Sequence, residues 1–177
     1  MEQMRATTII VAKRGKEVAI GGDGQVTLGD TVFKSKAKKI KKIQDYDVLT
    51  GFAGGAADSF SLSEKFEKYL ELYNGNVKKA SVELANEWRE DKALRTLDAM
   101  LIVASKEDIL VVSGNGDIIE PDEDIIAIGS GGNYAYSAGV ALLKNTNFSP
   151  EEIVLESLKI ASSICIYTNS NISIEKI

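Results

Sequence analysis

The stretch TTIIVAKRGKEVAIGGDG, residues 7–24, decides the fold that the sequence predicts. Residues 7–12 and 17–21 are short runs of apolar and β-branched side chains, a composition typical of strands. Between them lies KRGK, in which Gly15 suits a tight hairpin turn. We therefore expect two strands near the start of the chain that pair antiparallel.

The rest of the chain predicts a layered α+β domain. Further strands are expected at residues 48–54, 99–105, 109–113, 117–120, 125–129 and 171–177. Apolar side chains at helical spacing predict one helix that ends at Gly75 and a second through Trp88. A glycine turn at 129–132 leads into a third helix, and Ser149 and Glu152 form the capping box of a fourth. Blocks of strands separated by helix pairs indicate two sheets with the helices outside, in a single domain.

A lysine-rich segment, TVFKSKAKKIKKI at residues 31–43, reads as a strand with two faces. The face expected to be solvated carries Lys34, Lys36, Lys38 and Lys42. The opposite face carries Phe33, Ser35, Ala37 and Ile43, with Lys39 and Lys41 among them. At least one of these two lysines is expected to point inward, which is costly unless the lysine is paired or functional.

The residue types that are scarce or absent restrict the chemistry. The 177 residues include no histidine, which excludes Ser-His-Asp and Cys-His catalysis and the H-E-x-x-H metal helix. The single cysteine, Cys165, excludes an intramolecular disulfide and is expected to be a small core residue. A net charge of -5 argues against a general nucleic-acid partner. No apolar run is long enough for a membrane span or a secretion signal, so we expect a cytoplasmic protein.

Glycine-rich segments raise the alternative of a small nucleotide-binding α/β domain. GFAGGAAD, SGNGD and GSGGNYA all lack the G-x-x-x-x-G-K-[ST] and G-x-G-x-x-G patterns, so this hypothesis rests on the glycines alone. GSGG at the start of a helix still offers backbone N–H groups to an anion or oxyanion. Asp23, between glycines, is most simply a turn aspartate, and the acidic segment at 120–124 a solvated loop.

Thr7 becomes a catalytic candidate only as the first residue of a processed chain. A threonine hydroxyl is a weak nucleophile, but the α-amino group of the same residue, with a pKa of about 7.7–8.0, is a suitable base. A nearby lysine ammonium lowers that pKa further, and an aspartate can orient the lysine. Thr8, the next residue, is expected to be an ordinary strand residue.

Six segments together resemble one family. ATTII, GGDGQVTLGDTVFK, the lysine-rich segment, GFAGGAADSF, IAIGSGGNYA and ICIYTN occur in order from Thr7 to Ile174 and resemble the HslV (ClpQ) family of bacterial proteasome-like peptidases. The resemblance implies the N-terminal nucleophile hydrolase fold, a four-layer αββα sandwich of two antiparallel sheets flanked by helices. It also implies two stacked hexameric rings, and an HslU-type AAA+ ATPase hexamer that spends ATP, delivers unfolded proteins and activates the peptidase. No nucleic acid or membrane is implied.

The resemblance also assigns roles in a threonine peptidase. Thr7 matches the nucleophile, Asp23 the orienting carboxylate and Lys39 the lysine beside the terminal amine. Gly51 matches an oxyanion N–H donor, and Ser130 the residue that supports the amine and a bound water.

A structural sodium ion is the one bound ion that the resemblance implies. Its ligands are backbone carbonyls, which match Ser162, Cys165 and Thr168. The first position is usually glycine in the family, but carbonyl ligation tolerates serine. No cofactor is implied for the chemistry.

The resemblance places six residues before the nucleophile. We expect residues 1–6 to be an extension that is removed by autocatalytic cleavage between Ala6 and Thr7, leaving residues 7–177 as one peptidase domain. The alternative is a catalytically silent ring subunit with a structural or regulatory role, in which the extension is retained.

Overall fold

The structure is a computed structural model, of which we describe residues 4–5, 7–54, 56–90 and 99–177. Its strands are β1 (Met4–Arg5), β2 (Thr8–Arg14), β3 (Glu17–Gly22), β4 (Val26–Leu28), β5 (Thr31–Lys34), β6 (Ile40–Ile43), β7 (Val48–Ala53), β8 (Met100–Ala104), β9 (Ile109–Ser113), β10 (Ile118–Ile119), β11 (Ile125–Gly129) and β12 (Ser173–Lys176). Its helices are α1 (Ala56–Leu72), α2 (Val77–Glu90), α3 (Gly132–Asn145) and α4 (Pro150–Ile164), with a 3-10 turn at Gln44–Tyr46. Of the extension expected at 1–6, residues 1–3 and 6 lie outside the described residues.

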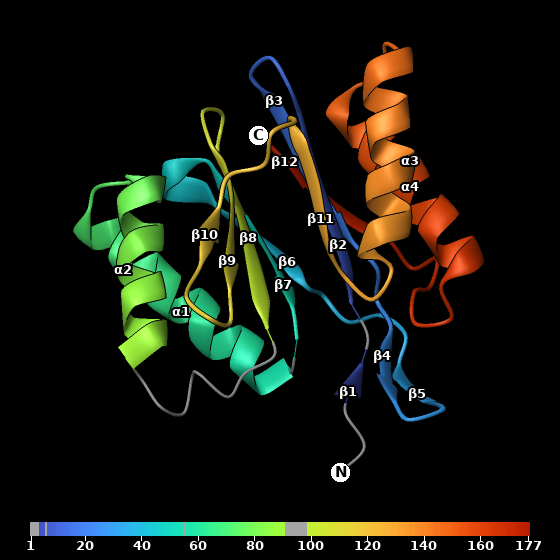
Figure 1. Cartoon of the computed structure of the whole chain (residues 1–177), viewed down its shortest axis with the longest axis horizontal. Coiled ribbons are helices and arrows are strands. Elements are labelled where there is room, and N and C mark those ends of the chain that lie inside the picture. Colours follow the sequence, from blue (N-terminus) through green and yellow to red (C-terminus); the bar gives the residue numbers. More distant parts are fainter. Residues whose placement is uncertain (1–3, 6, 55, 91–98) are drawn as a thin grey trace.

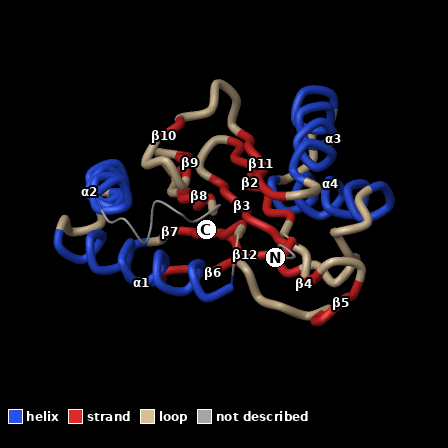
Figure 2. The backbone as a smooth tube through the Cα atoms, turned by 60° about the horizontal axis from the view of Figure 1, so that its bottom comes forward, coloured by secondary structure: helices blue, strands red, loops and turns tan. Residues whose placement is uncertain are grey.

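Two antiparallel sheets lie between two helix pairs, as predicted (Figure 1). One sheet has the strand order β10-β9-β8-β7-β6 and is covered by α1 and α2; the other has the order β11-β2-β3-β12 and is covered by α3 and α4. Figure 2 shows the helix pairs on opposite sides of the strands. Separate apolar clusters fill the space between the sheets and the space beneath each helix pair.

The hairpin of β2 and β3 explains why residues 9–12 form a continuous apolar run. Ile9 and Val11 pack into the cluster between the sheets, whereas Ile10 and Ala12 pack beneath α3 and α4. Side chains alternate between the two faces of a strand, so a strand covered on both faces needs apolar residues at every position. Gly15, with a φ of +63°, closes the turn, and the antiparallel pairing is confirmed.

The lysine-rich segment does not form one strand, and that prediction was wrong. It divides into β5 and β6, separated by residues 35–39, and these strands belong to different sheets. Phe33, expected on the inner face, is 68% exposed. Lys39 does turn inward, whereas Lys41 pairs with Glu67 at the surface. The segment leaves strand geometry where its chain crosses from the small sheet to the large one.

A third, small sheet was not predicted. It has the order β1-β4-β5, with Met4 opposite Leu28 and Arg5 opposite Thr27. Part of the segment before Thr7 is therefore a strand that pairs with the β4–β5 hairpin, in the lower part of Figure 1.

Local signals at the helix ends are borne out. Ser149 accepts a hydrogen bond from the Glu152 N–H, and the Glu152 side chain accepts from the Ser149 N–H, which completes the capping box of α4. Gly75, with a φ of +83°, follows α1 and donates its N–H to the Leu70 carbonyl. Within the part of the chain that is described, no helix has the length and apolar character that crossing a membrane requires.

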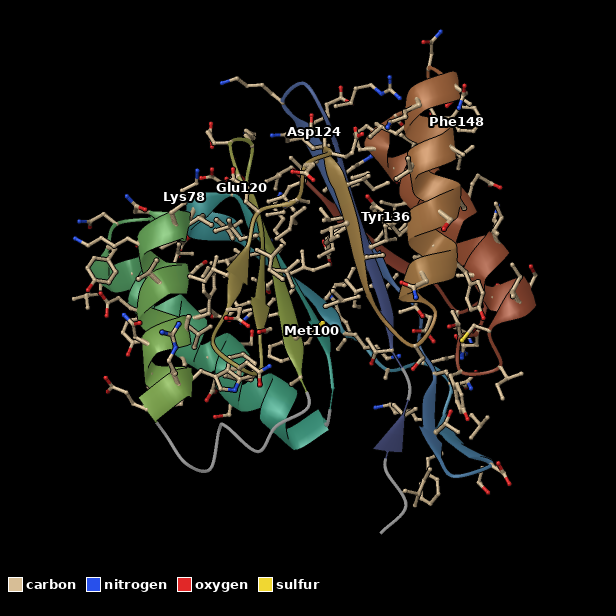
Figure 3. All side chains as sticks on the ribbon, in the orientation of Figure 1. Lys78, Met100, Glu120, Asp124, Tyr136 and Phe148 are labelled. Carbon is tan, nitrogen blue, oxygen red and sulfur yellow. The ribbon has the colours of Figure 1, made fainter. Side chains whose placement is uncertain are left out.

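The acidic segment at 120–124 is a loop with exposed carboxylates, as expected. Figure 3 labels Glu120 and Asp124 at its two ends, with Lys78 on the nearby helix α2. Glu120 lies 3.6 Å from Lys78, and Asp124 lies 3.2 Å from Lys13. These pairs are at the surface and contribute little to stability.

Candidate active site

Thr7 lies buried directly before β2, against the turn that follows β11. Its carbonyl oxygen accepts a hydrogen bond from the Ser130 N–H at 2.8 Å. Gly129 has a φ of +94°, and a Cβ atom at this position would stand only 1.8 Å from the Thr7 carbonyl oxygen. Glycine is therefore required both for the conformation of the turn and for its close approach to Thr7.

Asp23 is fully buried and accepts four hydrogen bonds. Its Oδ1 atom accepts from the Thr8 N–H at 2.9 Å and from the Lys39 ammonium at 2.8 Å. Its Oδ2 atom accepts from the backbone N–H groups of Gln25 at 3.0 Å and Asn169 at 3.2 Å. The bond from Gln25 closes the turn expected of an aspartate between glycines, and the remaining bonds connect this carboxylate to three other segments.

Lys39 is the inward-pointing lysine of the lysine-rich segment. Its side chain is 8% exposed, and its ammonium donates to Asp23 and, at 2.6 Å, to the Gln25 carbonyl. Burial lowers the pKa of Lys39, and the charge of Asp23 only partly opposes this effect. A lysine that is buried, paired and shifted in this way is a functional-site candidate.

The Oδ1 atom of Asp23 also sets the position of Lys39 relative to Thr7. The same oxygen holds the Lys39 ammonium and the Thr8 N–H, and that N–H belongs to the peptide bond that follows Thr7. The structure thus brings together four of the five catalytic candidates: Thr7, Asp23, Lys39 and Ser130.

Gly51, the fifth candidate, has a different environment. It lies within β7, opposite Ile40 on β6 and Ile102 on β8. The strand has neighbours on both sides at this position, and the oxyanion role of Gly51 stays a prediction. A Cβ atom on Gly51 would stand 2.6 Å from the Ile9 side chain, which explains the glycine by packing between the sheets.

The last residue of β7 lies near Gly129, which contacts Thr7. The Ala53 Cβ atom is 3.5 Å from the position of a Cβ on Gly129, the residue that touches the Thr7 carbonyl. Gly54, which follows β7, is exposed and has a φ of +144°.

The three carbonyl groups expected to hold a cation lie at and beyond the C-terminal end of α4. Ser162 is in the last turn, Cys165 is the C-cap residue, and the Cys165 carbonyl accepts a hydrogen bond from the Thr168 N–H at 3.1 Å. The last carbonyls of a helix lack intrahelical partners and carry partial negative charge. Oxygen donors of this kind fit a small, hard cation such as sodium. No group of three or more acidic, cysteine or histidine side chains suited to a metal ion occurs among the described residues.

Thr8 has a role that strand propensity did not indicate. Its side chain is fully buried, and its hydroxyl lies 2.7 Å from the Thr168 hydroxyl and accepts the Gly131 N–H at 3.0 Å. The expectation of an ordinary strand residue therefore holds for its backbone only. No local signal marks this contact, because its partners lie more than a hundred positions away in the sequence.

Asn169 was also missed as an individual residue, although it closes the quoted segment ICIYTN. Its backbone N–H donates to Asp23, and its side chain accepts from the Gly24 N–H at 3.1 Å and donates to the Ser35 carbonyl at 2.9 Å. It therefore fixes the chain on both sides of the Asp23–Lys39 pair.

Comparison with known proteins identifies relatives of this chain. The model of the family described as "Proteasome subunit" matches residues 4–177. The ATP-dependent protease subunit HslV of Caldanaerobacter subterraneus subsp. tengcongensis is 56% identical over 172 residues, which covers 97% of this chain and 98% of that protein. The corresponding subunit of Thermoanaerobacter sp. strain X514 is 54% identical with the same coverage.

Solved structures give the same family. The crystal structure of eukaryotic HslV from Trypanosoma brucei superposes with a TM-score of 0.89 at 43% identity, covering 96% of this chain and 98% of that one. Thiobacillus denitrificans BPH, at 16% identity and a TM-score of 0.72 over 96% and 97% of the two chains, shows the fold alone. With this identity along nearly its whole length, the chain belongs to the HslV family of proteasome-type protease subunits.

Proposed function

We propose that this protein is the peptidase component of an ATP-dependent protease and that Thr7 is its nucleophile once residues 1–6 are removed. The observation that carries the proposal is the buried Asp23–Lys39 pair, which is tied through one carboxylate oxygen to the backbone directly after Thr7. Membership of the HslV family supports a protease, and the absence of histidine from the sequence leaves the amine of Thr7 as a suitable base.

In the proposed reaction the Thr7 hydroxyl oxygen attacks the carbonyl carbon of a peptide bond, and the Thr7 α-amine takes the hydroxyl proton. The tetrahedral intermediate collapses with loss of the amine half of the substrate, which receives that proton. An ester between Thr7 and the acyl half remains. Water, deprotonated by the same amine, attacks the ester, releases the carboxylic acid and restores the hydroxyl.

Lys39 adjusts the base in this scheme. A positive charge close to the amine favours its neutral form, so the amine can accept a proton at neutral pH. Asp23 keeps the lysine in place, since an ammonium buried without a partner would be strongly unfavourable. Ser130, whose N–H binds the Thr7 carbonyl, is proposed to support the amine and an attacking water through its hydroxyl.

The Gly51 N–H is proposed as the oxyanion donor, on the strand β7 whose last residue, Ala53, lies beside the Gly129 turn. A crystal structure with a peptide aldehyde added to Thr7 tests this assignment. The hemiacetal oxygen is expected within hydrogen-bond distance of the Gly51 N–H, and a hemiacetal oxygen bound away from this N–H would contradict the assignment.

A sodium ion on the carbonyls of Ser162, Cys165 and Thr168 is proposed as a structural element without a part in the chemistry. A bound cation would order the loop that carries Asn169, which binds Asp23. Thermal unfolding tests this proposal at constant ionic strength: the midpoint is expected to be higher in sodium chloride than in tetramethylammonium chloride. Equal midpoints would contradict it.

The proposed assembly is two stacked hexameric rings, with a hexameric AAA+ ATPase of the HslU type that supplies unfolded protein and activates the peptidase. ATP is spent by this partner, consistent with the lack of a P-loop motif in the sequence. Light scattering on the purified protein tests the assembly: a mass of twelve chains is expected, and a monomer would contradict it.

Processing decides between an active peptidase and a silent ring subunit. Pairing of β1 with β4 gives the segment before Thr7 a defined place, which is the observation in favour of a retained extension. For an active peptidase, intact mass is expected to show loss of residues 1–6 from the wild-type chain. Thr7→Ala is expected to keep them and to lose hydrolysis of a fluorogenic peptide in the presence of the ATPase and ATP. Hydrolysis by Thr7→Ala, or by wild-type chains of full length, would overturn the proposed mechanism.

A further inference from the structure

The hydroxyl of Thr8 joins three segments that are distant in the sequence. It lies at the start of β2, 2.7 Å from the Thr168 hydroxyl beyond α4, and it accepts the Gly131 N–H at the start of α3. Thr8 is fully buried, Thr168 is 4% exposed, and both side chains are polar. Two hydroxyls and one backbone N–H therefore satisfy one another in a place without access to water.

The contact is closely packed. A Cβ atom on Gly131 would stand 2.4 Å from the Thr8 hydroxyl oxygen and 2.5 Å from that of Thr168. Only glycine at position 131 lets both hydroxyls approach the turn between β11 and α3. That turn also carries Ser130, whose N–H binds the carbonyl of Thr7.

Each of the three joined segments carries a part of the proposed active site. The start of β2 follows Thr7, and the turn before α3 holds Ser130. The loop beyond α4 provides the Asn169 N–H to Asp23. A shift of this contact would therefore move the groups around Thr7 relative to one another.

Stability alone requires the Thr8 hydroxyl, which accepts the buried Gly131 N–H, but does not require the Thr168 hydroxyl. A pair of buried hydroxyls can be replaced by apolar groups of the same shape at little net cost, provided that no polar group is left unpaired. The hydroxyl of Thr8 instead provides an acceptor for Gly131, and so sets the distance between β2 and the turn that carries Ser130.

We propose that Thr8 and Thr168 are positioning residues, which hold the Ser130 turn in register with Thr7 through their paired hydroxyls. The inference rests on the proposed role of Thr7 as the nucleophile. It adds that Thr8 is needed for turnover, although its hydroxyl takes no part in bond making or bond breaking.

The test uses chains freed at Thr7 by cleavage of an N-terminal fusion, so that an effect on processing does not enter. The variants are Thr8→Val, Thr168→Val and the double variant, each of which keeps the branched shape and removes a hydroxyl. Thr8→Ser restores the hydroxyl. Ser157→Ala is the matched control, because it removes a fully buried hydroxyl on α4 that has no hydrogen-bond partner among the described residues.

Peptide hydrolysis with the ATPase partner is expected to separate kcat from KM. Thr8→Val should lower kcat about 10- to 100-fold with KM little changed, because a small displacement of the reacting groups has an effect of this size. Thr8→Ser should recover most of the lost kcat, and Ser157→Ala should match the wild type. The double variant should lose less than the product of the two single losses, since both act on one contact.

Three outcomes would overturn the inference: wild-type kcat in Thr8→Val, a loss of kcat that Thr8→Ser does not recover, or equal losses in Ser157→Ala. Should circular dichroism show that Thr8→Val does not fold, Thr168→Val decides, because it leaves the Gly131 N–H its acceptor. An unchanged kcat in Thr168→Val would then refute the positioning role of the pair. Hydrolysis by the wild type together with its loss in Thr7→Ala keeps the proposed function intact in each case.

Discussion

The Lys39 ammonium lies 2.8 Å from the Oδ1 atom of Asp23, a carboxylate with no exposed surface. A buried ion pair of this kind is not by itself strong evidence of stabilisation, because both charges have lost their hydration. Removing one member, however, leaves the other charge buried without a counter-ion. The pair is therefore best probed by neutralising one partner at constant size.

Asp23→Asn keeps the shape of the side chain and removes its charge. We expect unfolding to become easier by about 3–5 kcal/mol, because Lys39 loses its counter-ion and the new amide turns a donor toward N–H groups that need acceptors. Urea denaturation measures this change. The loss of kcat, expressed as a free energy, is expected to be at least as large.

Asp108→Asn is the matched control. Asp108 pairs with Lys78 at 3.1 Å, and the Lys78 side chain is 55% exposed. Loss of such a surface pair is expected to cost less than about 1 kcal/mol. Similar losses of stability in Asp23→Asn and Asp108→Asn would show that the buried pair matters no more than a surface pair.

The lowered pKa of Lys39 predicts a bell-shaped dependence of kcat/KM on pH. Activity requires a neutral Thr7 amine and a charged Lys39, so the rate should rise as the amine loses its proton. It should fall again at a pH below 10.5, the ordinary pKa of lysine, because burial has lowered the pKa of Lys39. Lys39→Met should move the remaining acid limb to higher pH, since the charge that favours the neutral amine is gone. An acid limb that stays in place would contradict the proposed role of Lys39.

The lowered pKa of Lys39 also predicts how the free energy of unfolding depends on pH. Between the lowered pKa of folded Lys39 and 10.5, the unfolded chain holds the proton more tightly than the folded one, so the free energy of unfolding should rise with pH in this window. The free energy of unfolding of the wild type minus that of Lys39→Met separates this contribution from that of the other lysines. A difference that falls as pH rises through this window would contradict the direction of the shift.

Much of the fold was predictable because its signals are local. The hairpin at 7–24 follows from apolar runs and a turn glycine, and the capping box at Ser149 follows from neighbouring residues. The division of residues 31–43 into β5 and β6 was not predictable, because period-2 spacing does not show where a chain leaves one sheet for another.

The active-site candidates divide in the same way. The inward lysine was inferred from its position among apolar residues, but choosing Lys39 over Lys41 required the resemblance, and the distance to Asp23 required the fold. The contact of Thr8 with Thr168 spans 160 positions and left no pattern to detect.

Gly129→Ala is expected to abolish folding or activity. A methyl group at this position would stand 1.8 Å from the Thr7 carbonyl oxygen, and the φ of +94° is itself unfavourable for alanine. Gly15→Ala separates the two effects, since Gly15 also has a positive φ, +63°, but has nothing within 4 Å of an added methyl. Thermal unfolding should show a loss of about 1 kcal/mol for Gly15→Ala and a much larger one for Gly129→Ala. Equal losses would mean that the close approach to Thr7 is unimportant.

Tyr69 on α1 provides a test of the helix pair that lies away from the active site. Its hydroxyl donates to Glu87 on α2 at 2.8 Å, and Lys65 binds the other oxygen of the same carboxylate. Burial, followed by the bond and charge of Glu87, raises the pKa of Tyr69 to about 12. A raised pKa means that the associated stability is complete below the unfolded value of 10.0 and is lost as the pH rises through about 12.

Ultraviolet absorbance of tyrosinate follows this ionisation directly. Tyr69→Phe is expected to remove a titration step near pH 12 and to lower the free energy of unfolding at neutral pH by about 1 kcal/mol, the net value of one hydrogen bond. Tyr134→Phe, on α3, is the control, because Tyr134 is 43% exposed and loss of its hydroxyl should leave stability unchanged. A Tyr69→Phe titration that overlays the wild-type curve at high pH would show that Glu87 does not hold the Tyr69 proton.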